Sequence, residues 1–158
     1  MNFPIRLALP LLLVVTLCSG CSITNTVSPL AAPADLQELY LQRNDKVHMA
    51  EFHGALSTLL RDQGIKVHTV EGEFEPEMVH QATYTANWQW DVTMYLSYFQ
   101  LLINENGALA GSAEYDARSG SANLGKFGKA VSKIEPLIFE LFGRVQEKPE
   151  RSHEDDEY

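Results

Sequence analysis

The chain has 158 residues, a formal net charge of −9 at pH 7 and only two cysteines, and 45% of its residues are apolar. The acidic balance excludes ordinary nucleic-acid binding, which depends on lysine and arginine side chains that neutralise phosphates. The length suits one domain built around a single core.

The N-terminus has the features of a secretory signal. Arg6 precedes an apolar run from Leu7 to Leu17, and small residues follow this run. The run is shorter than the roughly 20 residues that a membrane-spanning helix needs, and it contains Pro10. Residues 1–20 are therefore predicted to be a signal peptide.

The next segment, Leu17-Cys18-Ser19-Gly20-Cys21, resembles a bacterial lipobox. The resemblance implies cleavage before Cys21 and a diacylglycerol group on the thiol of Cys21. Cys18 stands where leucine is the commonest residue, which is a mild departure from the pattern. Ser22 stands where inner-membrane lipoproteins often carry aspartate, so the resemblance implies an outer-membrane location. The alternative is an ordinary cleaved signal with a free or disulfide-bonded Cys21.

Composition divides the rest of the chain into three parts. Residues 21–34 contain two prolines, small residues and no charge, which indicates a lipidated cysteine followed by a flexible tether. Residues 35–145 are expected to form the domain. Residues 146–158 are rich in acids and lack apolar periodicity, which predicts a disordered tail. Loss of the signal peptide removes one charge, that of Arg6, and moves the net charge from −9 to −10.

The first half of the domain predicts a strand, a helix and a second strand. Leu36–Arg43 has the composition of a strand, and apolar residues at helical spacing follow between Met49 and Leu60. Gly64 marks the end of the helix, and Ile65–Val70 forms the next strand. Short connections of this kind indicate a right-handed βαβ unit.

The second half predicts two hairpins and a helix. From Thr83 apolar and polar residues alternate, and we expect a break near Asp91–Thr93, because one strand from 83 to 103 would be about 65–70 Å long. Asn106-Gly107 is a strong hairpin signal. An apolar stripe from Phe127 to Phe142 predicts a helix, either kinked at Pro136 or restarted there. The expected fold is an α+β two-layer sandwich, β-α-β-β-β-α, with about five strands in a mixed sheet and two helices on one face.

The stretch GSANLGKF, Gly120 to Phe127, has nearly the spacing of a phosphate-binding P-loop. Phe127 stands where the hydroxyl that holds Mg²⁺ is needed, and the preceding strand belongs to a hairpin, so we predict no nucleotide site. The glycines serve a sharp turn, and Asn123 is expected to cap the helix that follows. Three lysines are expected on the solvent side: Lys126, Lys129 and Lys133.

Other candidate chemistry is sparse. The five histidines, His48, His53, His68, His80 and His153, show no metal-ligand spacing, so each is predicted to be structural or exposed. No nucleophile stands in an elbow motif, and no acid/base pair is placed by spacing. The prediction is a non-enzymatic protein with no cofactor and no metal. Asp116 and Arg118 are either a ligand-binding pair or, with greater weight, an ion pair that fixes the loop.

The aromatic stretch suggests a contact surface. Trp88 and Trp90 project from one face of a strand and are expected in the core beneath the helices. Farther on, Tyr95 and Phe99 lie an even number of positions apart and so are expected on one face of the strand, while apolar residues also occupy the opposite face. A strand that is apolar on both faces is either covered twice or leaves an exposed patch, and such patches often mark interaction sites. Tyr95, Phe99, Asp116 and Arg118 are therefore the candidate binding residues.

Three segments, YTANWQWDVTMYLSYFQ, YDARSGSANLGKF and KIEPLIFELF, resemble those of a group of uncharacterised lipoproteins from Gram-negative bacteria. The domain is less closely similar to small α/β lipoprotein domains related to the curli-secretion lipoprotein and the TolB N-terminal domain. These resemblances imply a role in envelope assembly, as an adaptor for an envelope protein or component. A module that binds a small molecule, a glycan or a lipid, through residues 116–123 and nearby aromatics is the alternative.

Overall fold

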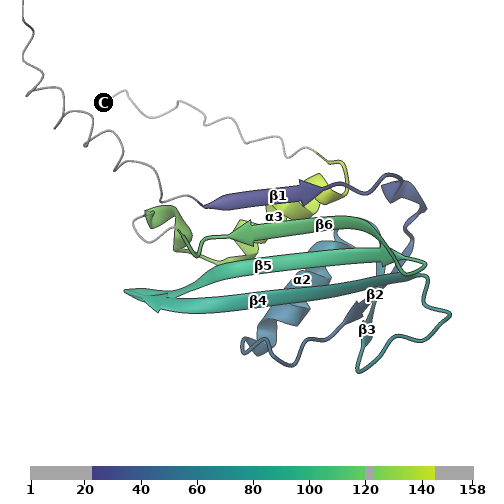
Figure 1. Ribbon diagram of the computed structural model, residues 1–158, viewed down its shortest axis with the longest axis horizontal. Coiled ribbons are helices and arrows are strands. Elements are labelled where there is room, and N and C mark those ends of the chain that lie inside the picture. Colours follow the sequence, from purple (N-terminus) through teal and green to yellow (C-terminus); the bar gives the residue numbers. More distant parts are fainter. Residues whose placement is uncertain (1–22, 120–122, 145–158) are drawn as a thin grey trace, which may run out of the picture.

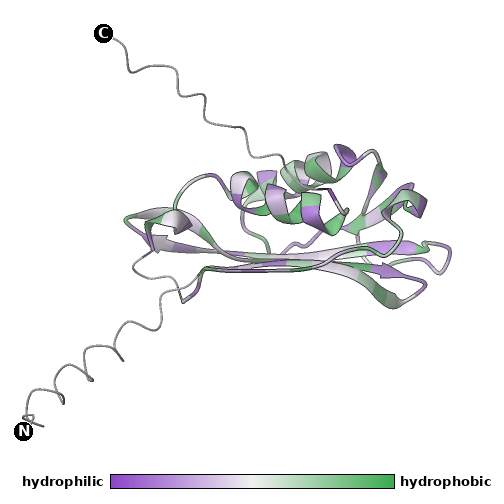
Figure 2. Cartoon of the chain, turned by 90° about the horizontal axis from the view of Figure 1, so that it is seen from above, coloured by the Kyte–Doolittle hydropathy of each residue, from purple (hydrophilic) through white to green (hydrophobic). Residues whose placement is uncertain are grey.

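The computed structural model describes residues 23–119 and 123–144, and these form a six-stranded mixed sheet with two α-helices on one face (Figures 1 and 2). The strand order is β1-β6-β5-β4-β2-β3. This confirms the α+β two-layer sandwich, with one strand more than expected. The signal peptide, Cys21, the segment 120–122 and the predicted tail all lie outside the described residues.

The predicted βαβ unit is confirmed as two adjacent parallel strands joined by a helix. Strand β2 (Glu38–Gln42) pairs in parallel with β3 (Lys66–Val70), and α2 (Ala50–Arg61) connects them. The apolar stripe of α2 is buried against the sheet. Gly64, at φ 85°, makes the left-handed turn after the helix, a conformation that glycine adopts without strain.

Three long antiparallel strands form the middle of the sheet: β4 (His80–Asp91), β5 (Thr93–Glu105) and β6 (Ala108–Asp116). The predicted break at 91–93 and the predicted turn at Asn106-Gly107 are both confirmed. Strand β5 also carries an irregularity, because Asn87 pairs with Tyr98 whereas Trp88 pairs with Leu96. Ser97 is therefore an extra residue, a β-bulge that exchanges the faces of the residues before it.

The flexible tether predicted for residues 21–34 is wrong for most of its described part. Strand β1 (Thr24–Ser28) pairs antiparallel with β6 along the edge of the sheet, and a short 3-10 helix η2 (Pro33–Asp35) follows. Leu30 packs into the core and donates its amide hydrogen to the carbonyl of Leu141 at 2.9 Å. This segment thus pairs with the edge of β6, which would otherwise be unpaired, and its few apolar residues pack against the core.

The C-terminal part forms a 3-10 turn η3 (Leu124–Lys126) and then helix α3 (Ala130–Leu141). The helix runs through Pro136 instead of restarting there. The side chain of Asn123 accepts a hydrogen bond from the amide of Gly125 at 2.8 Å, so the predicted cap is present and serves η3, not α3. Helix α3 contributes fully buried residues to the core, among them Ile134 and Ile138.

The core lies between the sheet and the two helices. Phe99 of β5 is fully buried and meets Phe52 of α2 at 5.9 Å between ring centroids. On the other face of β5, Tyr98 and Gln100 both donate hydrogen bonds to a carboxylate oxygen of Glu114 on β6, each at 3.0 Å. Around Glu114 that face is therefore polar, and its carboxylate is already hydrogen-bonded within the sheet.

Candidate binding surface

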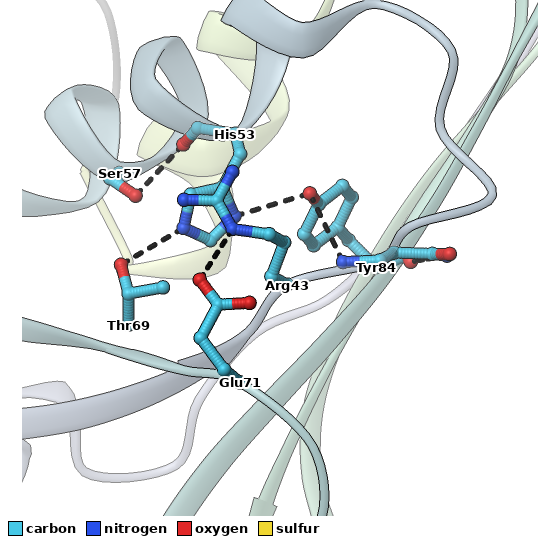
Figure 3. A network of polar contacts seen from close by, with 7 residues as sticks. Arg43, His53, Ser57, Thr69, Glu71 and Tyr84 are labelled. Atoms are coloured by element: carbon cyan, nitrogen blue, oxygen red, sulfur yellow. Dashed lines mark hydrogen bonds and ion pairs between the residues drawn. The ribbon is translucent and has the colours of Figure 1, made fainter.

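A buried polar network holds α2 on the sheet. The imidazole of His53 is buried, with Nδ1 3.1 Å from the hydroxyl of Tyr84 on β4 and Nε2 3.0 Å from the hydroxyl of Thr69 on β3 (Figure 3). Ser57, one turn farther along the helix, donates to the carbonyl of His53 at 2.8 Å. Burial lowers the pKa of His53, and the nearby Arg43 guanidinium lowers it further.

This network uses both nitrogens of the imidazole within the fold. A neutral imidazole has one donor and one acceptor, and the two hydroxyls satisfy them from strands that lie on either side of β2. His53 therefore has the structural role that the sequence predicts for it. Among the described residues, no group of three or more His, Cys, Asp or Glu side chains is arranged to hold a metal ion.

The edge of β4 facing β2 is paired over only two residues. Tyr40 and Leu41 of β2 pair with Gln81 and Ala82, and beyond Ala82 no described strand lies on that side of β4. The loop between β2 and α2 runs past this edge, and the Asn44 side chain donates to the Tyr84 carbonyl at 2.7 Å. A hollow of about 630 Å³ lies between this loop and β4.

A second hollow continues from the first towards the end of the β4–β5 hairpin, and we call it the β4 groove. Its volume is about 480 Å³, and it shares Lys46, Ala86 and Asn87 with the first hollow. Apolar and polar side chains both line the groove. The apolar ones include Met49, Trp88 and Met94, and the polar ones include Lys46, His48 and Arg118. Such a mixture is typical of a binding site, in which apolar area supplies affinity and polar groups fix orientation.

Trp88 and Arg118 are held in place by neighbours outside the groove. The Trp88 ring is half-buried and meets Phe52 edge-to-face at 5.1 Å. The Arg118 guanidinium lies 4.3 Å from the centroid of the Tyr98 ring and pairs with Asp116, with Nε 2.9 Å from Oδ1. Both groove residues are thus positioned before any ligand binds, which lowers the entropic cost of binding.

The structure brings together only part of the predicted binding set. Asp116 and Arg118 form the expected ion pair, and hydrogen bonding from Arg118 lowers the pKa of the Asp116 carboxyl. Arg118 lines the β4 groove, whereas Asp116 does not. Of the predicted loop, residues 120–122 lie outside the described part of the chain.

Tyr95 and Phe99 do not form an exposed patch, which was one of the two alternatives for a strand that is apolar on both faces. Phe99 is in the core, and Tyr95 is 5% exposed, in edge-to-face contact with Phe127 at 5.7 Å. The bulge at Ser97 is the reason, because it places the two side chains on opposite faces of the sheet. Apolar patterning cannot reveal an inserted residue of this kind.

Two further predictions about exposure are wrong. Trp90 is 72% exposed, because the hairpin extends past the helices that cover the rest of the sheet (Figure 1). Lys126 of η3 is 2% exposed, because its side chain turns towards β4, where its ammonium group lies 2.6 Å from the carboxylate of Asp91. Lys46 and Met49 were not predicted as groove residues either. Nothing in the sequence around Lys46 indicates a binding role, and Met49 was assigned to the apolar stripe of the helix, whereas it precedes α2 and is 40% exposed.

Comparison with known proteins adds a shared fold. No protein-family model matches the chain, and no curated protein gives a significant match. Among solved structures, a variant of PelC from Paraburkholderia phytofirmans, solved as a dodecamer, is 17% identical with a TM-score of 0.52, over 79% of this chain and 99% of that one. A second PelC dodecamer from the same organism is 13% identical with a TM-score of 0.48, over 79% and 98%. At this identity, the first similarity shows the fold and no more.

Proposed function

We propose that the chain is a non-enzymatic outer-membrane lipoprotein whose periplasmic domain binds an envelope protein or component. The lipobox resemblance at Cys21 and the serine that follows it support the anchor and the location. No helix in the described part of the chain has the length and apolar character needed to cross a membrane. The observation that carries the binding role is the β4 groove beside an unpaired strand edge.

An extended protein segment fits this surface. Beyond Tyr84, whose carbonyl already accepts a hydrogen bond from Asn44, the edge of β4 offers backbone donors and acceptors to an incoming strand, a common mode of peptide recognition. The groove beside it supplies apolar walls from Met49, Trp88 and Met94 for alternate side chains of that segment. A second copy of the chain is one such partner, because PelC, with the same fold, was solved as a dodecamer.

The second candidate function is small-molecule binding in the same groove. The volume of about 480 Å³ lies within the range of ligand pockets, roughly 300–1,000 Å³. Trp88 and Arg118 both line this groove, the first with an aromatic ring and the second with a cationic group. A glycan or a lipid headgroup would use both.

The test is site-specific photocrosslinking in cells, with a photoreactive residue at Met49 in the groove. Thr58, exposed on the helix that follows Met49, is the matched control position, and Cys21→Ala removes the proposed anchor. We expect one discrete product at Met49, absent at Thr58 and lost without the anchor. Mass spectrometry of the product separates a different envelope protein from a second copy of the chain.

Equal labelling at both positions, or none at Met49 in a folded and membrane-bound protein, would refute a protein partner in the groove. Titration of the purified protein with glycans and lipid headgroups, followed by Trp88 fluorescence in Trp90→Phe, then tests the second function. Fatty-acid analysis of the mature N-terminus tests the anchor independently.

A further inference from the structure

One end of the sheet contains both the start of the described chain and the end of the longest hairpin (Figure 1). Thr24 of β1 pairs with Asp116, which in turn pairs with Tyr98 of β5. Strand β5 continues five residues beyond that level, about 16 Å at the usual rise. Cys21, three residues before Thr24, can extend at most about 10 Å from it. Measured from the level of Thr24 along the strands, the hairpin therefore reaches at least as far as the proposed lipid anchor can.

The exposed apolar side chains concentrate at this end. Seven large apolar side chains are exposed in the described part of the chain: Met49, Val79, Trp90, Val92, Met94, Leu109 and Leu124. The three most exposed are Val92 (84%), Leu124 (81%) and Trp90 (72%), and all three lie at the hairpin end. We call these three residues the tip patch. Exposed apolar residues that gather in one patch, unlike single ones, often mark a site of contact with another protein or a membrane.

Val92 is also in an unfavourable backbone conformation. Its φ of 58° lies in the left-handed region, where a β-branched residue is strained. The turn at the other end of β5 also needs a positive φ, and there Asn106 and Gly107 adopt it, at 51° and 82°. The hairpin tip thus retains an exposed apolar side chain where asparagine or glycine would cost the fold less.

Contacts beneath the tip patch hold its parts together. The ammonium group of Lys126 in η3 pairs with Asp91 at 2.6 Å, beside Val92, and lies 4.9 Å from the centroid of the Tyr95 ring. Leu124 lies on the same 3-10 turn. Lys126 also neutralises the one acidic residue between Trp90 and Thr93, which lowers the cost of bringing this end close to an apolar phase.

The start of the chain lies against the same turn. A Cβ atom on Gly125 would be 3.7 Å from Cδ1 of Ile23, so Ile23 and η3 are neighbours. Two residues of chain span at most about 7 Å, which places Cys21 within that distance of Ile23. A lipid group on Cys21 would therefore be attached to the side of the domain that carries the tip patch.

We propose that the tip patch inserts into the interface of the bilayer that holds the lipid anchor, so that the domain stands on the membrane by its hairpin end. The inference rests on the proposed anchor at Cys21. Trp90 lies at headgroup depth, where tryptophan is favoured in membrane proteins. Val92 and Leu124 contribute apolar area beside it, at the depth of about 5–10 Å that interfacial segments reach. The β4 groove then opens just above the membrane surface.

The test is tryptophan quenching in proteoliposomes of phosphatidylethanolamine and phosphatidylglycerol that carry bromine on their acyl chains. The chain has two tryptophans, so Trp88→Phe leaves Trp90 alone and Trp90→Phe leaves Trp88 alone. We expect the brominated lipid to quench Trp90 several-fold more strongly than Trp88. Subtracting the fluorescence of Trp90→Phe from that of the unsubstituted chain gives the Trp90 signal a second time. This value does not need Trp88→Phe, which changes a residue packed against the core.

Equal or absent quenching of Trp90 in folded protein overturns the inference, whatever the state of Cys21. Mass spectrometry of the same sample shows whether Cys21 is acylated, and flotation shows whether the protein is on the liposomes. Acylated, floating protein with unquenched Trp90 would refute the tip contact and leave the anchor intact. Quenched Trp90 on a chain without acyl groups would refute the anchor and support the tip contact.

Discussion

The ammonium group of Lys126 lies 2.6 Å from the carboxylate of Asp91, and this contact joins the turn before α3 to the tip of the β4–β5 hairpin. The lysine is 2% exposed, whereas the aspartate side chain is 47% exposed. Tyr95 and Phe127 place their rings within 4.9 and 5.2 Å of the same ammonium group. The lysine is thus the desolvated member of the pair.

Asp91→Asn is expected to destabilise the protein by about 1–3 kcal/mol, because it removes a negative partner from a buried cation. Lys126→Met is expected to cost less, since the half-exposed Asp91 regains water and the methionine packs against the aromatic rings. Chemical denaturation of both variants measures the difference. A larger loss for Lys126→Met would show that the lysine stabilises the fold chiefly through its other contacts.

Val92→Asn is expected to stabilise the fold by about 1 kcal/mol, because asparagine tolerates the left-handed conformation that strains valine. Val79→Asn is the matched control, since Val79 is an exposed valine without a positive φ. Denaturant midpoints should rise for the first variant and not for the second. The same Val92→Asn protein should show weaker quenching of Trp90 by brominated lipid, and a gain in both properties would contradict a membrane role for Val92.

The sequence predicted the elements of this fold better than their surroundings. Periodicity located α2, the βαβ pairing and both turns of the central strands, since these depend on local patterns. It missed β1, because this edge strand has one core-facing residue, Val27, with Ile23 and Leu30 on either side of the strand, and because two prolines suggested a tether. Pairing with β6 is a long-range property that composition does not record.

The candidate site was harder to predict than the fold for two physical reasons. A single bulge at Ser97 reverses the face of Tyr95, so the alternation that is reliable within a regular strand fails across it. Exposure of Trp90 depends on where α2 and α3 end over the sheet, which no spacing in the hairpin encodes. Arg118 was identified because turn residues and a nearby acid favour an ion pair locally.

Leu30→Ala is expected to destabilise the whole domain by about 1–2 kcal/mol, somewhat less than a fully buried leucine. Its side chain is half-buried and packs over Gly111, where an added Cβ atom would lie 2.9 Å from Cδ2 of Leu30 and 3.0 Å from Cδ1 of Leu141. Thermal unfolding of Leu30→Ala beside Pro29→Ala measures the loss. If residues 24–30 served only as a tether, both variants would unfold at the temperature of the unsubstituted protein.

Stability is expected to fall as the pH drops below about 6.5, because His53 resists protonation in the folded protein. Burial lowers its pKa from the ordinary value of 6.5, so the unfolded chain binds a proton that the folded chain does not. The stabilisation is fully present above pH 6.5 and is lost as the pH falls towards the folded pKa, by at most about 1.4 kcal/mol per pH unit. His53→Gln should lower the melting temperature at neutral pH and flatten its dependence on pH between about 7.5 and 5.5. His48→Gln, at an exposed position before α2, should keep the full pH dependence, and a flat profile in that control would assign the effect to His48 instead.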